Sequence, residues 1–373
     1  MSTGGLRVLE VTARYLPFMG GVELHVDEVA RRLARRGVDV TILTTDPTAS
    51  LPVYEHVDGV AVRRVRAWPN KEDYYFAPHI YKEIRRGKWD VVHVHAYHTF
   101  VGPLAMSAAV RSGLPFVLTL HAGGHSSRLR NAIRPYQVAV LRPLLARADR
   151  LVALAPFEIP QYSKSLRLPV SRFALIPNGS DLPRPVVTAR SSSGPLIASV
   201  GRLERHKGHH RVLAALPHVL QARPDVRLWL AGSGPYEDSL RRLAMDLGVS
   251  ASVNISSIPP HERERMATEL SAVSVVVLMS EFETQPIAAL EALSLGCRLI
   301  VADRPGLAYL AEQGLARAVP LEAPPNEVAR AILDDLERPP LTDPPRLPTW
   351  DECADGLLEL YQSVHERSLH GQG

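Results

Sequence analysis

Short apolar runs alternate with amphipathic segments along most of the chain. An amphipathic helix is predicted at 22–37, where the pattern ends at Gly37. The strands predicted for the first half cover residues 6–12, 38–45, 90–95, 115–121, 150–155 and 173–177. Because these strands are nearly continuous apolar runs, with helical patterns between most of them, they favour a parallel sheet covered by helices on both faces.

The alternation stops near the middle of the chain and then restarts. Residues 181–195 are rich in Pro and Ser and show no period, which is typical of a linker. Further strands are predicted at 196–201, 226–231, 251–255, 273–279 and 298–302. We therefore predict an α/β protein with two Rossmann-like, doubly wound domains that face each other across a cleft. The predicted segments are an N-terminal domain at 1–182, a linker at 183–195, a C-terminal domain at 196–348, and a last helix within 349–373 that packs back across the first domain.

Composition adds limits to this picture. The 373 residues are 46% hydrophobic and 22% charged, as in ordinary globular proteins, and the length fits about two domains. The chain has no run of 18 apolar residues and begins without a secretory pattern, so we expect a cytoplasmic protein without a transmembrane helix. Cys297 and Cys353, the two cysteines, are too few for a disulfide framework or a cysteine-based zinc site, so we expect reduced thiols.

The charge is unevenly distributed. Residues 1–190 carry an excess of 11 positive charges and residues 191–373 an excess of 7 negative charges, which gives the net +4. The segment 128–150 is apolar along one side and rich in Arg, so it could bind an anionic membrane surface at the inner face of the membrane. The alternative is a packed helix with a solvated Arg face. Nucleic acid is not an expected partner.

Most of the chemically notable residues follow the predicted strands. In open parallel α/β sheets, ligands bind outside the carboxyl ends of the strands, so these residues are expected to line the cleft. They are Gly20, Gly21, His95, His121 and Asn178 in the first half, and Arg202, Lys207, Gly232 and Glu283 in the second.

Two of these groups suit an anionic ligand. Arg202 and Lys207 share one loop that leads into a helix, and a guanidinium beside an ammonium forms a good clamp for a diphosphate. The alternative is a pair of solvated surface cations. Gly20-Gly21 precede a helix and could offer backbone amides to an oxyanion. The chain has neither the GxGxxG of dinucleotide dehydrogenases nor a P-loop.

Two carboxylates stand eight positions apart, at Glu283 and Glu291. Glu291 falls within an apolar helical run, where a buried carboxylate is costly unless it has a partner. Pro286 suits the first position of that helix, so amides in the stretch Thr284-Gln285-Pro286-Ile287 would face a phosphate. A carboxylate accepts hydrogen bonds from two adjacent hydroxyls. One Glu could therefore hold a sugar and the other a ribose; the alternative for Glu291 is a partly exposed helix residue.

His93 and His95 lie on one face of a predicted strand, and an HxH pair at a strand end can bind a metal. A metal-dependent hydrolase is therefore one alternative function. Ligand carboxylates are not evident in the same half, however, and the chain has no DxD motif to hold a metal on a nucleotide sugar. We expect no metal and no cofactor, and we expect His93 to be a buried, hydrogen-bonded core residue.

Several short motifs together resemble the retaining glycosyltransferases of family 4, which have the GT-B fold. These are GGVE, TLH, IPNGSD, GRLERHKG, AGSGP and the Glu-x7-Glu pair, and they cover essentially the whole chain in the right order. The resemblance implies that the C-terminal domain binds a nucleotide sugar. Arg202 and Lys207 would neutralise its diphosphate, Glu283 would contact the donor sugar, and Glu291 would contact the ribose.

The resemblance also assigns roles in the first domain. Amides near Gly21 would touch the phosphates, and His121 would lie by the anomeric carbon and the acceptor, with His95 and Asn178 on the acceptor side. Retention would follow front-side attack, with protein cations in place of a metal. The chain departs from the family at 284–286, where Gly-Phe-Gly is usual, which leaves the sugar open. It also departs after 298–302, where no role is transferred.

The leading function is transfer of a hexose from a nucleoside diphosphate sugar to a hydroxyl acceptor. The acceptor would be a lipid-linked or cell-envelope glycan precursor, or a small glycoside. The alternatives are a nucleotide-sugar epimerase or hydrolase on the same fold, the metal hydrolase above, and a non-enzymatic sensor of sugar nucleotides.

Overall fold

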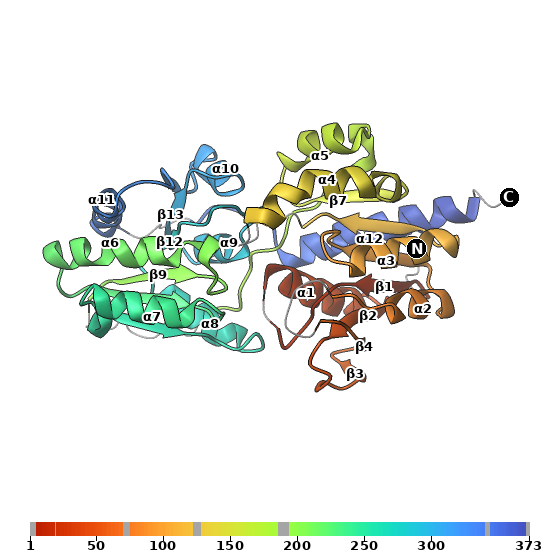
Figure 1. The fold of residues 1–373 in the computed structure, drawn as a ribbon, viewed down its shortest axis with the longest axis horizontal. Helices are drawn as coiled ribbons and strands as arrows, with labels where there is room; N and C mark the ends of the chain where they lie inside the picture. Colours follow the sequence, from red (N-terminus) through yellow and green to blue (C-terminus); the bar gives the residue numbers. More distant parts are fainter. Residues whose placement is uncertain are drawn as a thin grey trace. The chain divides into compact units, whose positions relative to one another are not determined.

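The chain forms two compact units (Figure 1). The computed structural model describes residues 5–18, 20–69, 75–121, 128–185, 194–339 and 344–370. The first unit contains Arg128–Gly179 together with the described residues before 122 and those from Thr349 onward. The second unit is formed by Ser180–Pro348. Most of the predicted linker, at 186–193, lies outside the described residues.

The first unit is built on an eight-stranded sheet with the order β3-β4-β2-β1-β5-β6-β7-β8. Every pairing is parallel except that of β3 with β4. The strands are β1 (Arg7–Val11), β2 (Asp39–Asp46), β3 (Tyr54–Val57), β4 (Val60–Arg66), β5 (Val91–His95), β6 (Phe116–Thr119), β7 (Arg150–Ala153) and β8 (Phe173–Leu175). The six strands predicted for this half are present. The β3–β4 hairpin was not predicted, because β4 alternates buried and exposed positions and carries three arginines instead of a continuous apolar run.

Helices cover this sheet, and the last of them comes from the far end of the sequence. They are α1 (Gly21–Arg35), α2 (His79–Arg86), α3 (Val101–Arg111), α4 (Arg128–Leu145), α5 (Glu158–Leu166) and α12 (Trp350–His370). Helix α12 packs against α1 and β5. Gly179 makes this packing close, because a Cβ atom there would lie 2.2 Å from the backbone nitrogen of Trp350. The Arg36 side chain adds ion pairs to Asp351 and Asp355 of α12.

The second unit contains a six-stranded, fully parallel sheet with the order β11-β10-β9-β12-β13-β14. Its strands are β9 (Leu196–Val200), β10 (Arg227–Ala231), β11 (Val253–Ser256), β12 (Val275–Leu278), β13 (Arg298–Ala302) and β14 (Arg317–Val319). Five of them match the predicted strands. The sixth, β14, has only three residues at the edge of the sheet, which is too short to give a clear pattern.

The helices of the second unit follow its strands in sequence and lie on both sides of the sheet in space (Figure 1). They are α6 (His209–Ala222), α7 (Glu237–Asp246), α8 (Arg263–Ser271), α9 (Ile287–Ser294), α10 (Leu307–Glu312) and α11 (Pro325–Leu336). Helix α6 packs against both α7 and α11. The fully buried strand β12 runs through the centre of the core.

Strand order reverses direction once in each doubly wound sheet. In the first unit the reversal lies between β1 and β5, and in the second it lies between β9 and β12. Ligands of open α/β sheets bind outside the carboxyl ends of the strands at such a switch point. The residues that follow β1, β5, β9 and β12 are therefore the first candidates for function.

Candidate functional site

An ion pair lies at the switch point of the second sheet. Lys207 ends the short helix η2 (Arg205–Lys207) in the loop after β9, and Glu283 lies in the loop after β12. The Lys207 Nζ atom is 2.6 Å from Glu283 Oε1, and each side chain is about one-fifth exposed or less. The two charges are thus held together before any ligand arrives, while one side of the pair remains open to solvent.

The two loops that carry this pair are fixed to each other through the backbone. Gly208, with a φ of +75°, directly follows η2, and a Cβ atom at this position would lie 1.8 Å from the carbonyl oxygen of Met279. Only glycine fits such a left-handed close approach without displacing the neighbouring chain. The amide of Glu281 also donates to the carbonyl of His206 at 2.9 Å. The position of Lys207 relative to Glu283 therefore depends on main-chain contacts as well as on their charges.

Arg202 stands in the same loop as Lys207 and is one-third exposed. Its guanidinium pairs with Glu204 at 2.6 Å. Burial alone would raise the pKa of Glu204, but the hydrogen bond with His206 and the charge of Arg202 lower it to about 2. Glu204 is therefore ionised at neutral pH and holds the Arg202 side chain in place. Both predicted cations of the diphosphate clamp are present, each beside a carboxylate.

The segment after Glu283 begins helix α9 one residue later than predicted. Pro286 is the N-cap and the helix starts at Ile287, so the expectation that Pro286 is the first helical residue is wrong. The side chain of Thr284 is buried, and its Oγ1 atom has no hydrogen-bond partner among the described residues. A buried hydroxyl without a partner is costly, and a ligand with polar groups would satisfy it.

The loop at Pro305-Gly306 packs against the backbone of Glu283, a contact that was not predicted from the sequence. Gly306 has a φ of +82°, and a Cβ atom there would lie 2.0 Å from the Glu283 carbonyl oxygen. The Glu283 amide also donates to the carbonyl of Pro305, at 3.4 Å. No role was assigned to the loop after β13, yet it packs directly against the backbone of the candidate site. The Pro305-Gly306 pair was the one feature of the sequence that indicated a close backbone contact at this loop.

Glu291 is buried, with 4% of its surface exposed, so the alternative of a partly exposed helix residue is wrong. Its carboxylate pairs with Arg263 of α8. This partner compensates the cost of burying the charge. Nothing in the spacing of the sequence pointed to Arg263, because α8 and α9 are brought together only by the fold.

Two of the glycine positions expected to line the cleft, Gly232 and Gly20, have close neighbours within their own units. At Gly232 a Cβ atom would lie 2.0 Å from the carbonyl oxygen of Gly201, so this glycine permits two backbone segments to meet. Gly20 is the N-cap of α1 and Gly21 its first residue. The carboxylate of Glu23 lies against Gly20 and pairs with Arg14 at 2.8 Å. An oxyanion bound at this helix end would therefore share it with a carboxylate.

Several polar side chains gather at the switch point of the first sheet. His95 contacts Glu10 on one side, with 2.6 Å between Nε2 and Oε2, and His121 on the other, with 3.0 Å between Nδ1 and Nε2. His25 of α1 lies beside these rings and bonds to Asn178 Oδ1 at 2.7 Å. His121 has a φ of +41°, which costs a non-glycine residue about 1–3 kcal/mol. The fold thus brings His95, His121 and Asn178 together, as expected for residues at neighbouring strand ends.

His93 is fully buried, as predicted for a core histidine, and bonds to Thr119 Oγ1 and Tyr361 Oη at 2.7 and 2.5 Å. Among the described residues, two groups of side chains lie close enough to share a metal ion: Glu10 with His93 and His95, and His25 with His95 and His121. All these side chains are buried and already hydrogen-bonded within the unit. The surface access that a hydrolase using His93 requires is therefore lacking at this residue.

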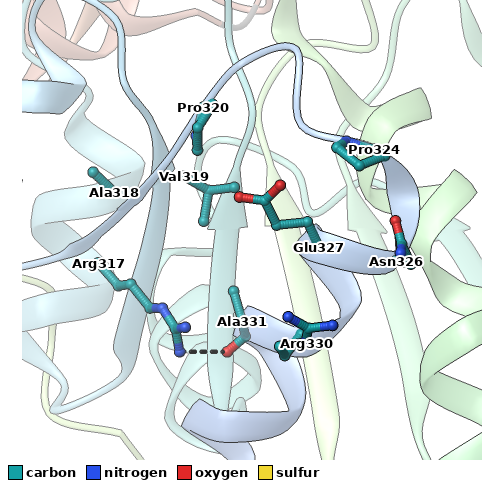
Figure 2. A pocket seen from close by; sticks show the side chains of 9 residues that line it. All are labelled: Arg317, Ala318, Val319, Pro320, Pro324, Asn326, Glu327, Arg330 and Ala331. Carbon is teal, nitrogen blue, oxygen red and sulfur yellow. Dashed lines mark hydrogen bonds between the residues drawn. The ribbon is translucent and has the colours of Figure 1, made fainter.

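A separate hollow lies between β14 and α11 (Figure 2). Its lining consists of Arg317, Ala318, Val319, Pro320, Pro324, Asn326, Glu327, Arg330 and Ala331. The Arg317 side chain is held by a hydrogen bond to the Ala331 carbonyl oxygen at 3.3 Å. None of the predicted site residues lines this hollow, so it is not part of the candidate site.

Curated proteins of known activity resemble the chain over most of its length. It is 31% identical to D-inositol 3-phosphate glycosyltransferase 1 of Catenulispora acidiphila, over 93% of this chain and 91% of the relative. It is 27% identical to a GDP-mannose:cellobiosyl-diphosphopolyprenol alpha-mannosyltransferase of Xanthomonas oryzae, over 83% and 81% of the two chains.

Solved structures and family models agree with these relatives. Sucrose-phosphate synthase from Thermosynechococcus elongatus superposes with a TM-score of 0.72 at 20% identity, covering 98% of both chains. HepE of Anabaena, solved with UDP-glucose, gives 0.69 at 17% identity, over 98% of this chain and 99% of that one. The model described as Glycosyltransferase Family 4 matches residues 19–184, and that described as Glycosyl transferases group 1 matches 185–343. The chain therefore belongs to the family 4 glycosyltransferases, with the GT-B fold of two Rossmann-like units.

Proposed function

We propose that this glycosyltransferase is a hexosyltransferase that moves its sugar from a nucleoside diphosphate sugar to a hydroxyl acceptor with retention of configuration. The observation that carries the proposal is the Lys207–Glu283 ion pair at the switch point of the second sheet. It places a fixed cation beside a fixed carboxylate where an α/β sheet binds its ligand. A nucleoside diphosphate sugar has an anionic diphosphate that Lys207 can bind and adjacent sugar hydroxyls that can donate to Glu283.

Each residue of the second unit has a role in this proposal. Lys207 and Arg202 stabilise the negative charge that develops on the leaving diphosphate, as protein cations in place of a metal ion. Glu283 accepts hydrogen bonds from the donor sugar, and Thr284 provides a buried hydroxyl that has no partner among the described residues. Glu291 accepts hydrogen bonds from the ribose while Arg263 balances its charge.

The proposed reaction is a front-side displacement. The bond between the anomeric carbon and the diphosphate oxygen breaks, and the acceptor oxygen bonds to the same face of the sugar. The acceptor proton passes to the leaving phosphate, so the step needs no carboxylate nucleophile. His121 lies by the reacting carbon, and the amides of Gly20 and Gly21 assist the phosphates.

The donor is identified by a thermal-shift screen of UDP, GDP, ADP and dTDP sugars. Because a ligand that binds the folded state raises its stability, we expect one nucleotide series to raise Tm by a few degrees at saturation. Lys207→Ala should abolish that rise. Failure of every sugar nucleotide to shift Tm would contradict the proposal. Turnover that proceeds equally well without an acceptor would instead indicate an epimerase or hydrolase.

We further propose that the acceptor is lipid-linked or belongs to the cell envelope and is reached at an anionic, cytoplasmic membrane surface. Among the described helices, none is long and apolar enough to cross a bilayer. Helix α4 does, however, expose an apolar stripe of Ile133, Tyr136 and Val140, with the last two more than 70% exposed. Arg142 lies on the same helix, and apolar side chains with basic neighbours favour anionic lipid.

Membrane binding can be measured by co-sedimentation with vesicles. We expect the protein to sediment with vesicles that contain anionic lipid and much less with neutral vesicles. The reason is that the arginines of α4, such as Arg142, and the apolar stripe both contribute to the binding free energy. Replacing Tyr136 and Val140 by Ser should weaken this binding. Met245→Ser is the matched control, since Met245 is also exposed but belongs to the second unit. Negligible binding to both kinds of vesicle would rule out the membrane role.

A further inference from the structure

The polar cluster of the first unit is built on three neighbouring strands. Glu10 of β1 pairs in register with His93 of β5, and His95 of β5 pairs with Thr119 of β6. Glu10 is only 1% exposed, in the interior of a parallel sheet where a carboxylate is costly. Its hydrogen bonds run to His95 and Tyr361, which are distant from it in sequence, and His95 in turn contacts His121.

We propose that Glu10 is a positioning residue that, through His95, holds His121 in one tautomer, with Nε2 protonated and Nδ1 free to accept. The proposal rests on the proposed role of His121 beside the reacting sugar. Neither Glu10 nor His95 needs to touch substrate for this, and both are buried.

The proton positions on the His121 side follow from the charge of Glu10. Burial alone would raise the pKa of Glu10, but the neighbouring His93 and His95 lower it well below its usual range. An ionised carboxylate can only accept, so His95 must donate from Nε2. Burial lowers the pKa of His95 to about 4, so this ring is neutral, and with its proton on Nε2 its Nδ1 carries none. His121 must then donate from Nε2 across the 3.0 Å contact.

The other oxygen of Glu10 gives a consistent result. Tyr361 of α12 donates to Glu10 Oε1 at 2.9 Å, which uses its one hydroxyl proton. The 2.5 Å contact with His93 therefore requires His93 Nδ1 to donate to the tyrosine oxygen. His93 Nε2 contacts the Thr119 hydroxyl at 2.7 Å, and either group can be the donor there. Glu10 therefore sets the direction of the hydrogen bonds that Tyr361, His95 and His121 donate.

This arrangement leaves one ring nitrogen of His121 for a ligand. Burial lowers the pKa of His121 well below its usual value, so the imidazole is neutral. With Nε2–H committed to His95, the Nδ1 lone pair can accept a hydrogen bond from a sugar or acceptor hydroxyl. The same ring in the other tautomer would present a donor instead, and a hydroxyl bound through its proton would lose that bond.

A metal ion bound by His25, His95 and His121 is the competing arrangement, because ligand atoms of these three rings lie within 4.8 Å of one another. A metal would replace the proton between His95 and His121. The metal-bound arrangement therefore predicts that Nε2 of His121 carries no hydrogen. The hydrogen-bonded arrangement of Glu10, His95 and His121 predicts that Nε2 is protonated. The tautomer of His121 distinguishes the two.

The direct test is the NMR spectrum of the full-length protein labelled with [15N]histidine, in which ring nitrogen shifts report the tautomer. Assignments come from single replacements of His25, His93, His95 and His121. We expect Nε2–H at His95 and His121, and Nδ1–H at His93. A His121 ring protonated at Nδ1 instead of Nε2 overturns the proposal. Because this measurement needs no activity, it is decided even if the transferase proposal fails.

The variant Glu10→Gln tests the consequence for turnover. Tyr361 and His95 contact different oxygens of Glu10, and in the amide one of these oxygens becomes an NH2 donor, so we expect His121 to lose its single tautomer. We expect kcat to fall about 10- to 100-fold, as for other groups that orient a functional histidine, with the donor KM within about twofold. Thr119→Val is the control, because it removes a bond of the same cluster that does not lead to His121.

The control should keep the His121 tautomer and a kcat within about twofold of the wild type. A Glu10→Gln protein with both its tautomer and kcat unchanged would overturn the positioning role. If that variant does not fold, the wild-type spectrum still decides the question.

Discussion

Replacing Glu283 by Gln is expected to raise the transition-state barrier of sugar transfer by about 2–4 kcal/mol, or ~30- to 1000-fold in kcat/KM. The amide keeps the size of the side chain and loses its charge and half of its accepting capacity. It also leaves Lys207 without the partner that holds it at 2.6 Å. The measurement is steady-state kinetics with the donor found by thermal shift, together with a denaturation curve to show that the fold is intact.

Glu281→Gln provides the matched control for this change. Glu281 lies in the same loop, but its side chain is more exposed and contacts Arg211 at a loose 3.4 Å. Exposed pairs of this kind contribute little, so we expect kcat/KM within about twofold of the wild type. Near-normal turnover in Glu283→Gln would remove the basis of the proposed donor site.

Lys207→Ala is expected to cost a similar amount, about 2–4 kcal/mol in kcat/KM, for a different reason. The ammonium group is proposed to neutralise the leaving diphosphate, so its loss should also weaken binding of the free nucleoside diphosphate. Glu283→Gln should leave that binding largely unchanged, because the diphosphate lacks the sugar. Calorimetric titration of the nucleotide into each variant therefore separates the two roles. Equal nucleotide affinity in Lys207→Ala and the wild type would contradict the clamp.

A charge control and a double variant complete this experiment. Arg223→Ala removes a cation that pairs with Asp225 at the other end of α6, and it should change neither turnover nor nucleotide binding. The double variant Lys207→Ala/Glu283→Gln should lose less than the two single losses combined, because the paired groups act as a unit. Losses that simply add would show that the ion pair has no functional part.

The strands and the site loops were predictable because their signals are local. Buried parallel strands are continuous apolar runs, and the residues that follow them reach one edge of the sheet whatever the tertiary details. Lys207 and Glu283 were found in this way. Strand β4 was missed because it alternates buried and exposed positions, as a half-solvated strand does. A search for continuous apolar runs does not detect a strand of this kind.

The partners of the buried charges could not be predicted for a different reason. Glu10 meets Tyr361 across 351 positions of sequence, and Glu291 meets Arg263 across 28. No periodicity joins residues on different elements, so these pairs exist only after the sheet and helices have assembled. The sequence did show that a carboxylate at 291 needs a partner, and the structure supplies it.

The first unit is discontinuous, since its sheet is covered by a helix that begins at Trp350. During translation, all of Ser180–Pro348 leaves the ribosome before that helix exists. Until α12 is synthesised, the N-terminal part of the first unit leaves exposed the surface of α1 and the site at Gly179 that α12 later covers. Residues 180–348 can already fold during this time. We therefore expect that in a fragment ending at residue 348 the second unit folds, whereas the first unit stays incompletely packed and is recognised by chaperones.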